Sequence, residues 1–176
     1  AIYSGRKWTM AGNLIEKNII HNVGSLNPVG KEVWMVYWDD VLSGNTMNNN
    51  ILIGNPNRED IRGLQLAQGP FNNVYNNTFV GGTWYKEKTM VSIENTDNLK
   101  MYNNIFYAQS GNSLIYNEAG TNLDFNYNCW YHPSSSLPSL EGSKSFKSDP
   151  LFVLNNGTLE GDYTLQNNSP CLNVGL

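Results

Sequence analysis

An all-β fold of stacked coils is the class that this sequence predicts, and three observations lead to it. Asn accounts for 28 of the 176 residues, and Asn favours turns over helices because its side chain bonds nearby backbone groups. Apolar runs of three to six residues are separated by Gly and Asn, and no window keeps a helical period, which indicates strands and turns. A motif centred on Asn recurs along the chain, as in a solenoid.

The repeat is anchored on five asparagines spaced 24 to 32 residues apart, within the roughly 20–50 expected of solenoids. The anchors are Asn18, Asn50, Asn77, Asn104 and Asn128, and the apolar residues three positions before them are Ile15, Met47, Val74, Met101 and Phe125. If each coil lies about 4.8 Å above the last, equivalent amides can hydrogen-bond along a column. We therefore expect a parallel β-helix of about five coils with an Asn ladder.

The elements follow this repeat in order. The first coil starts with strand-like residues 1–8, and a loop at 24–32 precedes the strand at 33–38 that opens the second coil. Later coils run over 61–82, 89–110 and 113–131, with strands expected at 64–66 and 90–94 and an excursion at 81–88. We divide the single domain into coils at 1–132 and, at 133–176, an extended loop and a closing tail that packs over the last coil.

Composition excludes two classes of partner. The net charge of −4 provides no basic footprint for nucleic acid. No apolar stretch of 18 residues occurs, so no membrane-spanning helix is expected. Because the first residues already form a strand without a polar cap, we expect the N-terminal part of a longer chain, or another subunit, to cover the first coil.

Three groups of residues resemble the C-terminal half of bacterial, pectate-lyase-like parallel β-helix proteins that act on polysaccharides. They are Gly5-Arg-Lys-Trp-Thr with Gly12-Asn13 and Asn18-Ile-Ile-His21, Tyr37-Trp-Asp-Asp with Ser43-Gly-Asn, and Asp149-Pro150-Leu-Phe with Gly161-Asp-Tyr-Thr-Leu and Ser169-Pro170. The resemblance spans nearly the whole chain. It implies a right-handed β-helix, a polysaccharide or oligosaccharide partner and a secreted or periplasmic location. It is weak for the reaction, because this scaffold hosts glycosidases, lyases, esterases and binders.

Four carboxylates are the candidates for catalysis. Asp39 and Asp40 end the strand at 33–38, and Glu94 and Glu118 take the corresponding place in the fourth and fifth coils. In the later coils, strand residues alternate between the core and the outer face. When this alternation is aligned on the Asn anchors, it predicts that Asp40 and Trp38 point outward and that Asp39 lies toward the core end of its strand. Side chains one rung apart (about 5 Å) or two rungs apart (about 10 Å) suit retaining or inverting glycosidases, respectively. The alternative is a turn-capping Asp beside a solvated one.

The pattern around Asp39 also resembles that of β-helix β-xylosidases, in which a similar acid at the end of a strand is the nucleophile. Their acid catalyst precedes a Gly-Pro turn one coil further on. Here Gln65 takes that place, ahead of Gly69-Pro70. An amide cannot donate a proton as a carboxylic acid does, so the chain departs from that mechanism, and Gln65 is predicted to bind substrate instead.

Other side chains are candidates for substrate binding. Trp38 and Trp84 could stack on sugar rings, unless they pack in the core or under loops. Arg62 could line a groove beside the second coil or simply solvate a loop, and His21 matches a His of the resembled family but could be structural.

No acidic ligands recur at metal spacing, so no cofactor is expected apart from Ca²⁺ if the protein is a lyase. Cys129 and Cys171 both lie toward the C-terminus and could form a disulfide or remain two buried thiols.

Three hypotheses for function follow. The first is a glycoside hydrolase that cleaves a plant or algal polysaccharide or oligosaccharide with paired carboxylates. The second is a polysaccharide lyase on the same scaffold. The third is a non-catalytic module that binds glycans or has a structural role.

Overall fold

The described strands form three parallel sheets in a computed structural model, which describes residues 2–7, 9–25, 33–55, 61–81, 90–108, 114–133, 142–154 and 163–172. Sheet A contains β1 (Ile2–Ser4), β4 (Val33–Trp38), β7 (Ile61–Ala67), β10 (Val91–Glu94) and β13 (Ile115–Glu118). Sheet B contains β2 (Leu14–Glu16), β5 (Thr46–Asn48), β8 (Asn73–Tyr75), β11 (Lys100–Tyr102) and β14 (Asp124–Asn126). Sheet C contains β3 (Ile19–Ile20), β6 (Ile51–Ile53), β9 (Thr78–Gly81), β12 (Ile105–Ala108), β15 (Cys129–Tyr131) and β16 (Phe146–Lys147).

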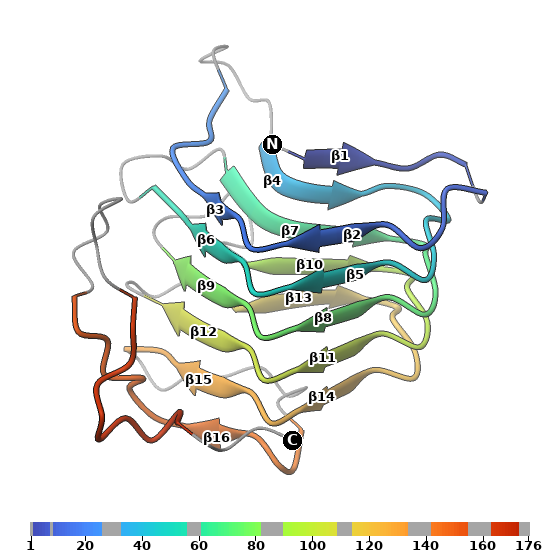
Figure 1. The fold of residues 1–176 in the computed structure, drawn as a ribbon. Helices are drawn as coiled ribbons and strands as arrows, with labels where there is room; N and C mark the ends of the chain where they lie inside the picture. Colours follow the sequence, from blue (N-terminus) through green and yellow to red (C-terminus); the bar gives the residue numbers. More distant parts are fainter. Residues whose placement is uncertain are drawn as a thin grey trace.

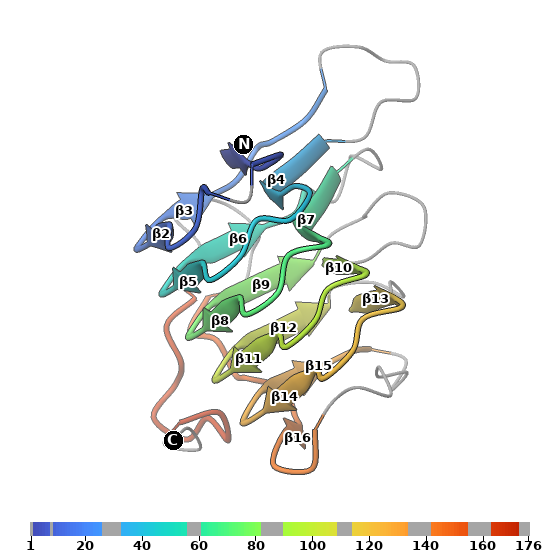
Figure 2. The ribbon, with the colours of Figure 1, turned by 90° about the vertical axis from the view of Figure 1, so that its right-hand side faces the viewer.

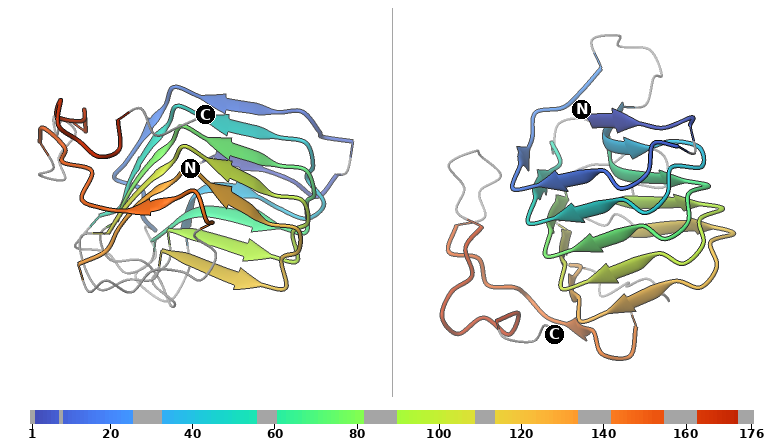
Figure 3. Two further views of the ribbon diagram at one scale, coloured as in Figure 1. Left: turned by 90° about the horizontal axis from the view of Figure 1, so that it is seen from below. Right: turned by 45° about the vertical axis from the view of Figure 1, so that its right-hand side comes forward.

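Each coil contributes one strand to each sheet, so consecutive coils stack as the repeat predicts (Figures 1 and 2). In Figure 1 the chain runs along sheet A at the back, returns along sheets B and C in front, and descends one level per coil, which is a right-handed winding. The view from below shows the three sheets around one interior (Figure 3). The prediction of a right-handed parallel β-helix of stacked coils is confirmed.

The Asn ladder lies at the corner between sheets B and C. The backbone N–H and the Nδ2 of Asn50 both donate to Oδ1 of Asn77, at 3.0 and 2.9 Å, and the same pair of bonds recurs at every step from Asn18 to Asn128. Below the last coil, the N–H of Asn128 donates to Oγ of Ser145, which ends the ladder. Amides that are buried at each tight turn are thereby paired, as required where no water reaches them.

A second, shorter ladder joins sheets A and B. Asn13 donates twice to Oδ1 of Asn45, and Asn45 donates twice to Oδ1 of Asn72. The register of the strands places Leu99 next in this column, where no amide is present and the ladder stops. The sequence repeat did not reveal this ladder, because only three coils carry it.

The core is a set of apolar columns inside the coil. The five residues expected three positions before the anchors, Ile15, Met47, Val74, Met101 and Phe125, are all buried. On sheet C, Phe79, Phe106 and Trp130 stack face to face with ring centroids 4.9 and 4.1 Å apart. Stacked rings at this spacing follow directly from the rung spacing of a parallel sheet.

The tail closes the last coil only in part. Phe146–Lys147 pairs with β15 and so adds a further rung to sheet C, as a closing segment should. Beyond it, however, the described residues turn back along the outer face of sheet C, where Phe152 and Tyr163 pack against Val80 and Tyr107. The Cys129–Cys171 disulfide fastens this segment to β15. The tail therefore covers a side of the coil as well as its end (Figure 2).

Candidate functional site

The acidic residues meet at the carboxyl edge of sheet A. Glu94 pairs with Ala67 on one side and with Glu118 on the other, and all three point outward because Leu66 and Ile93, which precede Ala67 and Glu94, lie in the core. Trp38 pairs with Leu66, so Asp39 continues the strand beside Ala67. The outward column is therefore Asp39, Ala67, Glu94 and Glu118.

The expectation that Asp40 belongs to this column is wrong by one residue. The corner from Asp39 to Asn45 is seven residues long, whereas the corners from Ala67 to Asn72 and from Glu94 to Leu99 are six. The second coil thus carries one extra residue at its acidic pair. The prediction counts residues back from the Asn anchor. Because the extra residue lies between the anchor and the acidic pair, the predicted register of this pair is shifted by one residue.

Trp38 and Trp34 lie on opposite faces of β4, and the prediction that Trp38 points outward is wrong. Met35 and Val36 are consecutive core residues, so the alternation of the strand is interrupted between the two tryptophans. Trp38 is 1% exposed and packs in the core, where it cannot stack on a sugar. Trp34 lies outside and stacks on Tyr37, with ring centroids 4.7 Å apart.

Asp39 accepts four hydrogen bonds. Its Oδ1 accepts from the hydroxyl of Tyr37 at 2.6 Å and from the N–H of Asp40 at 3.0 Å. Its Oδ2 accepts from the hydroxyl of Tyr3 at 2.7 Å and from Nε of Arg6 at 2.8 Å. The carboxylate is 2% exposed, yet the Arg6 side chain above it is 75% exposed and Tyr3 is 55% exposed. Asp39 is therefore covered by two side chains that solvent reaches.

These bonds fix the charge of Asp39. Burial by itself raises the pKa of this carboxyl, but the hydrogen bonds from Tyr37, Tyr3, Arg6 and the Asp40 backbone outweigh it and lower the pKa to about 2. The Tyr37 hydroxyl responds in the opposite direction: burial, then its bond to Asp39 and the charges of Asp39, Asp40 and Glu94, raise its pKa. Asp39 is thus an anion and Tyr37 a neutral donor near neutral pH.

The next rung joins Gln65 to the same outer face. Gln65 pairs with Tyr37 in the sheet, and its Oε1 accepts from Nε1 of Trp34 at 3.1 Å and from Arg62 at 3.4 Å. The Arg62 guanidinium lies 5.9 Å from the centroid of the Trp34 ring. Gln65 is 1% exposed and Arg62 6%, so both hold Trp34 and Tyr37 in place. Of this group, the two half-buried aromatic rings are the ones that a ligand can reach.

The remaining predicted residues lie elsewhere. His21 follows β3 at the end of sheet C, on the side of the molecule away from the carboxyl end of β4 (Figure 1). Trp84 lies outside the described residues. Glu118 is exposed, one rung beyond Glu94, and accepts a 3.4 Å bond from Tyr116. In the described part of the chain, no three His, Cys, Asp or Glu side chains come together as ligands for a metal ion.

Three contributors to the site were missed in the sequence: Tyr3, Tyr37 and Arg6. Tyr37 stands two positions before Asp39, and Tyr3 stands two positions before Gly5, which follows β1 and lies beside Asp39. Because residues two positions apart on a strand share a face, counting back two positions from Asp39 and from Gly5 would have identified both tyrosines as outward neighbours. Arg6 takes a positive φ of 63° after β1, and no feature of the sequence signals that conformation.

Comparisons with family models, with curated proteins and with solved structures find no match. Among the described residues, no helix is long and apolar enough to cross a lipid bilayer.

Proposed function

We propose that this chain is a carbohydrate-active protein that binds a glycan along the carboxyl edge of sheet A and hydrolyses it with paired carboxylates. The observation that carries the proposal is the outward column in which Asp39 and Glu94 are two rungs apart with Ala67 between them. Two rungs correspond to about 10 Å between backbones, just above the roughly 6.5–9.5 Å that separates the two carboxylates of inverting glycosidases.

Asp39 and Glu94 would have different roles. Asp39, whose pKa is lowered to about 2, stays ionised and would be the carboxylate that orients the attacking water and accepts its proton, although so low a pKa makes it a weak base. Glu94, half-buried at the same edge, would protonate the leaving oxygen. Before that water can bind to Asp39, one of its two exposed partners, Arg6 or Tyr3, would have to release its hydrogen bond to Oδ2. Trp34 and Tyr37 supply aromatic faces beside the column for the sugar rings.

A second candidate function is glycan binding without cleavage. The observation that favours it is that all four acceptor positions of Asp39 are occupied, as expected of a carboxylate that holds a corner together. A lyase has less support, because it needs a deprotonated base. The hydrogen bond to Asp39 and burial raise the pKa of Tyr3, the pKa of Tyr37 is raised too, and Arg6 stays charged.

The proposed location is outside the cytosol. The Cys129–Cys171 disulfide supports it, since disulfides form and persist mainly in secreted and periplasmic proteins.

The test is a screen of plant and algal polysaccharides, with new reducing ends measured for hydrolysis and ultraviolet absorbance measured for unsaturated uronates. Changing Glu94→Gln should lower turnover by about 10²–10⁴-fold, the usual contribution of a general acid, and Asp39→Asn should do the same. Glu118→Gln is the matched control on the next rung and should keep activity. NMR of the first product should show inversion at the anomeric carbon.

Three results would decide against the hydrolase. Turnover that survives both Glu94→Gln and Asp39→Asn would remove this pair from the reaction. Retention of glycan without new reducing ends would leave the binding function, and a rise in unsaturated uronate would replace hydrolysis with elimination. Asp39→Asn also weakens the hydrogen bonds that hold its corner, so the result for Glu94→Gln decides the test. Circular dichroism of both variants should show that the β-helix is intact.

A further inference from the structure

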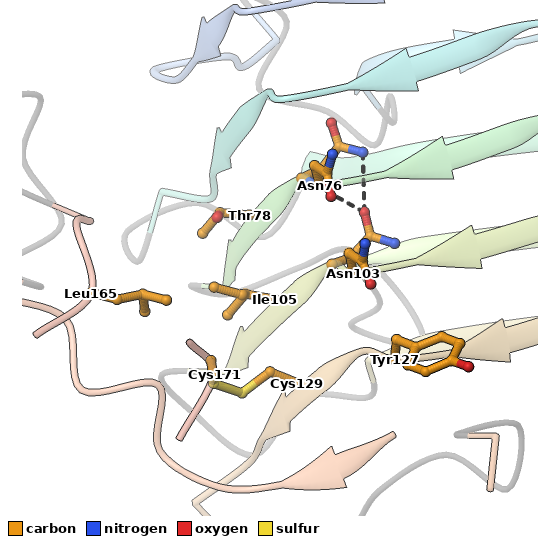
Figure 4. A pocket seen from close by; sticks show the side chains of 10 residues that line it. Asn76, Thr78, Asn103, Ile105, Tyr127, Cys129, Leu165 and Cys171 are labelled. Carbon is orange, nitrogen blue, oxygen red and sulfur yellow. Dashed lines mark hydrogen bonds between the residues drawn. A yellow bond between two sulfur atoms is a disulfide. The ribbon is translucent and has the colours of Figure 1, made fainter. Parts of the chain in front are cut away.

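A cavity of about 290 Å³ lies on the far side of the coil from the carboxyl end of sheet A, between the Asn corner and the C-terminal segment (Figure 4). One wall is the corner between sheets B and C, with Asn76, Asn103 and Tyr127. The other wall is the tail, with Leu165 and the Cys129–Cys171 disulfide. The volume is at the lower end for ligand pockets, which suits a small molecule rather than a polymer.

The two rows of asparagines at this corner differ in what their amides do. Asn77 and Asn104 use their side chains in the ladder, where they bond to each other and to backbone carbonyls. Asn76 and Asn103, each one residue earlier, have a positive φ, and neither side-chain amide has a hydrogen-bond partner. The Oδ1 of Asn103 is fully buried in this unpaired state. A ligand that bonds Asn103 would relieve a cost that buried polar groups rarely carry, whereas the exposed Asn76 offers its amide without such a cost.

The lining also limits the chemistry of that ligand. It consists of amides, the hydroxyl of Thr78, the phenol of Tyr127 and the apolar side chains of Ile105 and Leu165, and it contains no charged side chain. The Tyr127 hydroxyl accepts a 2.9 Å bond from Lys144, which holds its ring in position at the rim. Amides and hydroxyls beside an aromatic ring and opposite an apolar wall match a neutral sugar, which has hydroxyl edges and C–H faces.

We propose that this cavity is a binding site for a single neutral sugar unit, with Asn76, Asn103 and Thr78 as its hydrogen-bonding residues. The site is separate from the Asp39 column and does not depend on hydrolysis there. The disulfide belongs to the site because it fixes Leu165 and its neighbours as the second wall. Reduction should therefore weaken binding without any change in the asparagines.

The test is a titration of the ¹⁵N-labelled protein with D-glucose, D-galactose, D-xylose and D-mannose, followed by heteronuclear NMR. At least one sugar should give saturable shifts at the residues that line the cavity. Asn103→Gly and Asn76→Gly remove the amides while accommodating the positive φ, and each should weaken binding by about tenfold, the worth of one hydrogen bond. Asn49→Gly is the matched control, since Asn49 has the same φ of 55° one coil above and does not line the cavity.

The controls also separate this site from the hydrolase proposal. Asp39→Asn and Asn49→Gly should leave the sugar affinity within about twofold. The proposal is overturned if none of the four sugars gives saturable shifts. It is also overturned if Asn103→Gly and Asn76→Gly both bind as the unchanged protein does.

Discussion

The strongest stability prediction concerns the middle of the Asn ladder. In Asn77, Oδ1 accepts two hydrogen bonds from Asn50, and Nδ2 donates to the carbonyls of Met47 and Tyr75 and to Oδ1 of Asn104. Asn77→Ala would leave the buried N–H of Asn50 without its acceptor and would take a donor from each of these two carbonyls. At about 1–3 kcal/mol for each group, and with some relaxation, the free energy of unfolding should fall by about 4 kcal/mol.

The matched variant is Asn18→Ala in the first coil. Asn18 has the same place in its corner, but its half-buried side chain donates only to Glu16 O and Oδ1 of Asn50, and the Asn50 amide has other partners. Its loss should cost about 1 kcal/mol. Urea unfolding followed by circular dichroism measures both. If Asn77→Ala cost no more than Asn18→Ala, the ladder would not be stabilised by pairing of buried groups, and the reasoning would fail.

Three further predictions concern other parts of the coil. Because the pKa of Asp39 is lowered from 3.8 to about 2 on folding, its contribution of about 2 kcal/mol is present above pH 4 and is lost as the pH falls through 2; urea midpoints across this range should show the loss, and Asp39→Asn should abolish it. Phe106→Ala should cost about 3–5 kcal/mol in urea unfolding by removing the middle ring of the core stack, whereas the exposed Phe71→Ala should cost less than about 0.5. Reducing Cys129–Cys171, which are 42 residues apart, should lower the free energy of unfolding by about 4 kcal/mol in the chain-entropy account, and an unchanged melting temperature would contradict it.

The parts of the fold that the sequence predicts correctly follow the corner between sheets B and C. In every coil this corner has the same form: the strand of sheet B ends, one residue with positive φ follows, and then comes the ladder Asn. Since the length never changes, the residues three positions before each Asn reach the core in all five coils. Local chemistry fixes this corner, so its repeat is visible without a structure.

The corner between sheets A and B has no such constancy, and this explains the errors at the candidate site. From Gly5 to Asn13 it takes nine residues, from Asp39 to Asn45 seven, and from Ala67 to Asn72 six. A position inferred from the Asn anchor is therefore reliable only for residues that follow this corner. Asp39 precedes it, and so do its partners Tyr3 and Tyr37.

A better reference for Asp39 lies within sheet A itself. Leu64 with Leu66, and Val91 with Ile93, alternate inward just before the corner, and Val36 with Trp38 match them rung by rung. That register depends on core packing alone, because a slip of one residue would turn Trp38 outward and Asp39 inward at the cost of a buried charge. The side chain that settles which acid joins Glu94 on the outer face is thus Trp38, which the sequence had suggested as a sugar platform and which the core requires instead.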